Sequence, residues 1–98
     1  MSTSIHPIPE LVDRIRQEYA NGKPISELLE IICQTLNSKS KIICVFYISS
    51  AFGIGPGRAG HVAMSEIFQE GGRTSAQLQE SMVAYIEERK QQLAERYQ

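Results

Sequence analysis

An apolar run, residues 42–52, dominates the middle of the chain and leads directly into a glycine-rich corner, residues 53–60. Only Ser49 and Ser50 interrupt the run. If the run is a strand, the glycines that follow it mimic a nucleotide-binding turn. If it is a helix, they form the corner between two packed helices. The conformation of this run therefore decides both the fold and the chemistry open to the chain.

The need for strand partners favours a helix for this run. Its β-branched and aromatic content is typical of a strand, and flanking lysines are unfavourable at a helix start. However, a buried strand must pair, and no other segment alternates between apolar and polar residues. Ser40 suits an N-cap, and Gly53 suits a helix end. We therefore predict a buried central helix over 41–52; the alternative is an α+β fold with 41–48 as a strand paired across a dimer.

Periodic apolar residues predict helices on both sides of this run. Ile8, Leu11, Val12 and Ile15 show the i, i+3, i+4, i+7 spacing of one helix face. Thr74 and Gln77 fit a capping box at the start of the last helix. We predict an all-α, compact bundle of about five helices, in one domain over 1–98 with flexible ends at 1–6 and 97–98. The expected helices are 8–20, 25–37, 41–52, 57–69 and 74–96.

Composition and charge narrow the classes of function. The apolar share of 42% and charged share of 21% are ordinary for a globular protein. The formal net charge is −1, and no basic stripe is available for a phosphate backbone, so we do not expect nucleic acid as a partner. The apolar run is shorter than the ~20 residues that span a bilayer, and the N-terminus does not resemble a secretory signal. We expect a soluble, cytoplasmic protein with no membrane contact.

The two cysteines and the glycine corner are the main candidates for chemistry. Cys33 and Cys44 lie in apolar segments and are expected to be buried thiols; a disulfide between them is the alternative, which spacing does not decide. Residues 55–60 match G-x-G-x-x-G, but no second strand or acidic residue follows to complete a dinucleotide site. A milder hypothesis is an anion or ligand loop at a helix start. Its residues would be Gly55, Gly57, Arg58 and His61.

No catalytic or metal-binding set is evident. The cysteines and histidines lack metal-ligand spacing, and no nucleophile motif accompanies a base. We therefore expect no enzyme activity, cofactor or metal, and predict a small protein-binding module such as an inhibitor, immunity or regulatory protein. Homodimerisation is compatible with this function. The alternatives are a helix-turn-helix-like DNA-binding regulator using 42–69 and ligand binding at 53–61. The candidate partner contacts, on the last helix and just after it, are Glu80, Glu87, Glu88, Glu95 and Tyr97.

Overall fold

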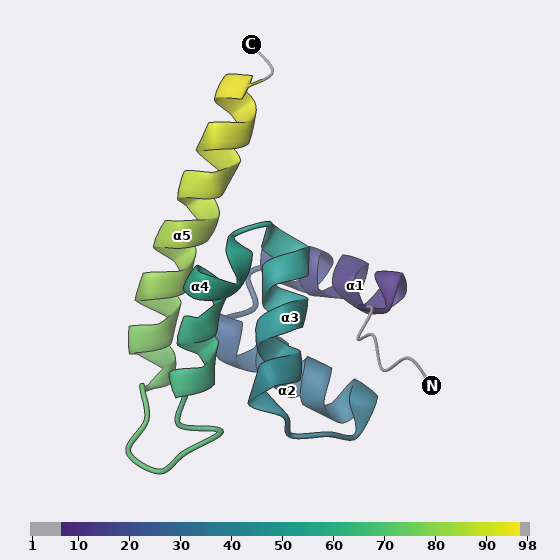
Figure 1. Cartoon of the computed structure of the whole chain (residues 1–98), viewed down its shortest axis with the longest axis vertical. Helices are drawn as coiled ribbons and strands as arrows, with labels where there is room; N and C mark the ends of the chain where they lie inside the picture. Colours follow the sequence, from purple (N-terminus) through teal and green to yellow (C-terminus); the bar gives the residue numbers. More distant parts are fainter. Residues whose placement is uncertain (1–6, 97–98) are drawn as a thin grey trace.

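The computed structural model describes residues 7–96, which form an all-α bundle (Figure 1). The predicted fold class is confirmed. Residues 1–6 and 97–98, which were expected to be flexible, lie outside the described residues. The candidate partner contact Tyr97 is one of them. The helices, in chain order, are α1 (Pro9–Ala20), α2 (Ile25–Leu36), α3 (Lys41–Phe52), α4 (Gly55–Ala59), the 3-10 helix η1 (Gly60–Met64) and α5 (Ser75–Arg96).

The apolar run forms α3, which lies at the centre of the bundle and contacts α1, α2, α4 and η1. The side chain of Ser40 accepts a hydrogen bond from the Ile43 amide at 3.4 Å and so caps the first turn. Gly53 ends the helix in the left-handed conformation at φ 65°, which glycine adopts without a Cβ clash. The alternative with a strand over 41–48 is therefore wrong.

The core is built from side chains of α1, α2, α3, α4, η1 and the first half of α5. On α5 the buried residues are Leu78, Met82 and Ile86, at the i, i+4 spacing of one helix face. The last turns of α5 project beyond the rest of the bundle (Figure 1). Although α5 has 22 residues, no helix within 7–96 is both long and apolar enough to cross a membrane.

The predicted helix over 57–69 is wrong beyond Met64. The chain turns to an extended conformation at Ser65 (ψ 147°) and makes a short backbone bridge with Arg73. The Arg73 amide donates to the Met64 carbonyl at 2.7 Å, and the Glu66 amide donates to the Arg73 carbonyl at 2.9 Å. These bonds replace those that a continuing helix would make, so the segment 65–74 is a closed loop between η1 and α5.

Candidate functional site

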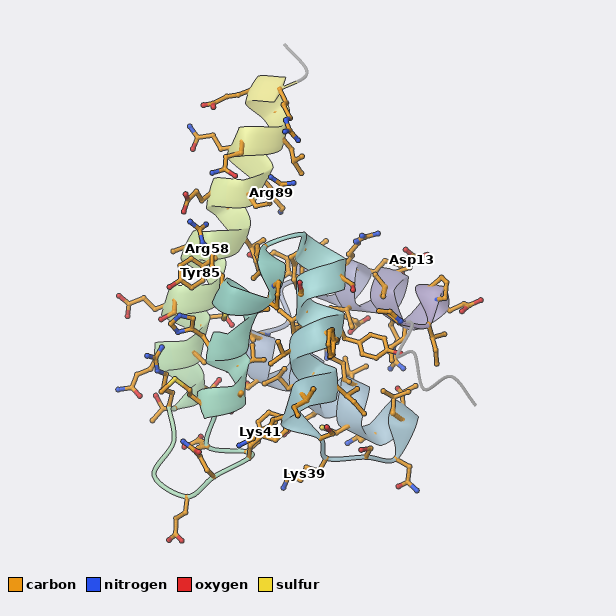
Figure 2. The ribbon with its side chains drawn as sticks, viewed as in Figure 1. Asp13, Lys39, Lys41, Arg58, Tyr85 and Arg89 are labelled. Carbon is orange, nitrogen blue, oxygen red and sulfur yellow. The ribbon has the colours of Figure 1, made fainter. Side chains whose placement is uncertain are left out.

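The glycine-rich corner after α3, residues 53–60, contacts α5 through Arg58. The guanidinium of Arg58 lies 5.2 Å from the centre of the Tyr85 ring, within the range of a cation–π interaction. Its Nη1 atom is also 3.2 Å from Oε2 of Glu88. Figure 2 shows Arg58 and Tyr85 meeting where α4 lies against α5. The first charged residue of the predicted ligand loop is therefore engaged within the protein.

His61 is held by hydrogen bonds at both ring nitrogens. Arg73 Nη1 lies 3.0 Å from Nδ1, and the Tyr85 hydroxyl lies 3.2 Å from Nε2. Because an arginine guanidinium only donates, Nδ1 accepts this bond, and the neutral ring then donates from Nε2 to the tyrosine oxygen. A Cβ added at Gly55 or Gly57 would meet no atom within 4 Å, but Gly55 has φ 84°, a left-handed conformation that favours glycine, whereas Gly57 does not. Through His61, the predicted loop joins η1, the 65–74 loop and α5.

The acidic residues predicted on α5 fall into two groups. Glu87 accepts a hydrogen bond from the Tyr19 hydroxyl at 3.2 Å and lies 3.6 Å from Nζ of Lys90, while Glu88 pairs with Arg58. Glu80 and Glu95 are exposed. Burial, together with the charge of Glu87 and its hydrogen bond, raises the pKa of Tyr19 to about 12. Two of the predicted contacts are therefore also part of the contact between α5 and its neighbours.

Sequence reasoning missed an exposed apolar surface on α3. The helix buries one side, but Ile42 is 61% exposed and Phe46 is 41% exposed. Ile42 also lines a surface pocket of about 430 Å³ with two apolar residues of the 65–74 loop. We define the α3 face as Lys39, Lys41, Ile42, Phe46, Ile67 and Phe68. The one feature of the sequence that could have indicated this surface is the pair of lysines before the apolar run, because lysines keep that end of the helix in solvent.

A second pocket, of about 450 Å³, lies where α5 leaves the bundle. Arg16 on its wall donates from Nε to the Ala51 carbonyl at 2.7 Å and from Nη2 to the Ser50 carbonyl at 3.3 Å. It thereby satisfies the carbonyls at the C-terminal end of α3. The Nε atom of Arg89 is buried without a hydrogen-bond partner in 7–96. The apolar wall is formed by Tyr19, Phe52, Ile86 and Leu93.

The two cysteines are free and adjacent. The sulfur of Cys33, on α2, lies 3.7 Å from that of Cys44, on α3. Cys44 is buried, whereas Cys33 is partly exposed and lines a surface pocket of about 690 Å³. Burial, reinforced by the neighbouring Cys33, raises the pKa of the Cys44 thiol. The sequence predicted two buried thiols; the structure buries Cys44 and leaves Cys33 partly exposed.

Within 7–96, no group of three or more histidine, cysteine, aspartate or glutamate side chains is arranged to hold a metal ion. No protein-family model matches the sequence, and neither a curated protein nor a solved structure matches the chain. The chemistry of the surfaces described above is therefore the basis for inferring a function.

Proposed function

We propose that the chain is a non-enzymatic protein-binding module that docks a partner on the α3 face. The observation that carries this proposal is the exposure of Ile42 and Phe46, one helical turn apart on the same helix. Single exposed apolar residues are ordinary, but here Ile42 continues into Ile67 and Phe68 along one pocket. Full burial of an exposed aliphatic or aromatic side chain contributes about 1.5–3 kcal/mol, and the half-buried Ile42 and Phe46 retain about half of that gain for a partner that covers them.

The two lysines of the α3 face favour an amphipathic helix with acidic residues at that edge as the partner, while Glu66, which lines a pocket with Lys39 and Ile67, disfavours carboxylates beside the 65–74 loop. An i, i+4 apolar pair on a helix is the usual anchor for a second helix. Lys39 and Lys41 are exposed and make no ion pair with another residue of the described chain. Carboxylates on the partner would meet these ammonium groups, which speeds association and fixes the orientation of the helix.

The geometry gives less support to the other functions. The DNA-binding alternative over 42–69 needs a recognition helix, but two short helices stand in place of the predicted helix over 57–69, and its basic residues Arg58 and His61 are held against α5. The same contacts reduce the support for an anion loop at 53–61. Both nitrogens of His61 are engaged, which also leaves it poorly placed as a catalytic base.

Site-specific photo-crosslinking in the cells that make the protein tests the proposed surface. One full-length chain carries the crosslinking side chain at position 46, and a matched chain carries it at Met64, which is 45% exposed but lies outside the α3 face. We expect a partner adduct at position 46 and none at position 64. The crosslinked partner segment should be helical, apolar on one side and acidic at one edge. A crosslinked second copy of this chain, or no adduct at position 46, would contradict the proposal.

Affinity measurements with the crosslinked partner test the role of each kind of side chain. Phe46→Ser should weaken binding at least about tenfold, because a central aromatic anchor contributes more than ~1.4 kcal/mol. Lys39→Glu with Lys41→Glu should slow association most strongly at low salt. Met64→Ser should leave the affinity unchanged. Equal affinities for the Phe46 and Met64 variants would show that the partner does not use the α3 face.

A further inference from the structure

We infer that Cys33 and Cys44 form an intramolecular thiol–disulfide site, in which a hydroperoxide oxidises Cys33 and Cys44 then closes the disulfide. The inference rests on two adjacent thiols of unequal exposure, and it holds whether or not a partner docks on the α3 face. It assigns a chemical role to the largest of the described pockets, which is lined by Cys33.

The distance between the sulfurs permits closure. A disulfide bond is about 2.05 Å long, so sulfurs that are 3.7 Å apart must approach by about 1.7 Å. A change between staggered rotamers moves a cysteine sulfur by more than this distance. The two residues lie on α2 and α3, which contact one another and are joined by the short turn 37–40. Closure therefore links two helices that already contact one another.

Exposure assigns a different role to each thiol. Cys33 opens into the surface pocket, where Lys39 also lies, and a small peroxide can reach its sulfur. Cys44 is 1% exposed, so an oxidant in solution does not reach it directly. Burial also keeps Cys44 in its protonated form, in agreement with the raised pKa of this thiol. Cys33 is thus the attacking residue, and Cys44 is the resolving residue.

The reaction balances with hydrogen peroxide as the oxidant. The Cys33 thiolate attacks one peroxide oxygen; an S–O bond forms, the O–O bond breaks, and the departing hydroxide leaves as water after taking a proton. The sulfur of Cys44 then attacks the sulfenic sulfur of Cys33. An S–S bond forms, the S–O bond breaks, and the hydroxyl leaves as water with the Cys44 proton. The two thiols lose two electrons and two protons, and the peroxide is reduced to two molecules of water.

Treatment of the reduced, folded, full-length protein with hydrogen peroxide tests the site. We expect the free thiols to fall from two to none per chain and the intact mass to fall by two hydrogen atoms. A proteolytic digest should contain Cys33 linked to Cys44 of the same chain, and the protein should stay in its original oligomeric state. Dithiothreitol should restore both thiols. These measurements use the natural sequence and do not depend on how a variant folds.

Two variants separate the roles of the thiols. In Cys44→Ser, Cys33 should stop at the sulfenic acid, which dimedone traps; Cys44→Ala serves if the serine variant does not fold. In Cys33→Ser, loss of the Cys44 thiol should be slower by at least about tenfold, because that sulfur is buried. The inference is overturned if Cys33 proceeds to sulfinic acid while Cys44 stays a thiol, if the disulfide joins two chains, or if both thiols survive peroxide that oxidises free glutathione.

Discussion

Replacing Gly72 with alanine should destabilise the protein at the loop that joins η1 to α5. A Cβ at this position would lie 2.6 Å from the Met64 carbonyl oxygen, 2.8 Å from the Ser65 carbonyl carbon and 2.9 Å from the Glu66 amide nitrogen. All three neighbours are backbone atoms, so no flexible side chain can move aside. The backbone bridge between Ser65 and Arg73 must open to admit the methyl group.

The expected cost has two parts. Forcing a methyl group into a closely packed site costs about 1–3 kcal/mol. Opening the bridge also weakens the two hydrogen bonds that Arg73 makes with Met64 and Glu66, each with a net contribution of about 0.5–1.5 kcal/mol. These parts add to about 2–6 kcal/mol; because the two bonds are weakened rather than lost, we expect Gly72→Ala to lower the free energy of unfolding by about 2–4 kcal/mol. A domain of this size has about 5–15 kcal/mol, so the variant should still fold.

Gly57→Ala is the matched control, since nothing lies within 4 Å of a Cβ at Gly57 and its φ is not in the left-handed region. Alanine there should raise stability by up to about 1 kcal/mol through helix propensity. Urea unfolding followed by circular dichroism gives both free energies. Hydrogen exchange at the amides of Glu66 and Arg73 should speed up in Gly72→Ala alone. Equal stabilities for the two variants would refute the close approach at Gly72.

Two further predictions concern α5 and its contacts. The folded state raises the pKa of Tyr19 from 10 to about 12, so the stability that this residue contributes should be full below pH 10 and lost as the pH rises towards 12. The difference in phenolate absorbance between the wild type and Tyr19→Phe measures the pKa of Tyr19. Glu87→Gln should lower this pKa, and a wild-type value of 10 would contradict the prediction. Thr74→Ala removes the hydroxyl that accepts from the Gln77 amide at 3.3 Å and should cost about 1 kcal/mol of unfolding free energy. Thr35→Ala, at an exposed position within α2, is the control. A similar change in unfolding free energy for both variants would show that Thr74 does not cap the helix.

Local sequence signals predicted the helices well where short-range contacts decide them. The capping box forms as expected: the Thr74 amide donates to Gln77 Oε1 at 3.0 Å, and the Gln77 amide donates back to Thr74 Oγ1. Ser40 and Gly53 likewise begin and end α3. The segment after Met64 was mispredicted because its conformation depends on backbone bonds to Arg73, nine residues further on, which a helical pattern of apolar residues does not reveal.

The functional surfaces were harder to predict than the helices. Because the apolar residues of the run have no clean helical period, the sequence does not show which face of the helix is exposed. Ile42 and Phe46 were therefore assigned to the core with their neighbours. Arg58 and His61 were correctly noticed as chemically distinctive, but sequence spacing did not reveal that both meet Tyr85 on α5. The distance between Cys33 and Cys44 was undetermined for the same reason, since it depends on how α2 crosses α3.

The two proposals involve the same part of the molecule. Lys39 and Ile67 line the pocket that exposes Cys33, and both also line the pocket beside Ile42. A helix bound on the α3 face as proposed would therefore also cover residues that line the pocket of Cys33. If both proposals hold, a bound helix should slow the oxidation of Cys33, although each proposal has its own test and either can fail alone.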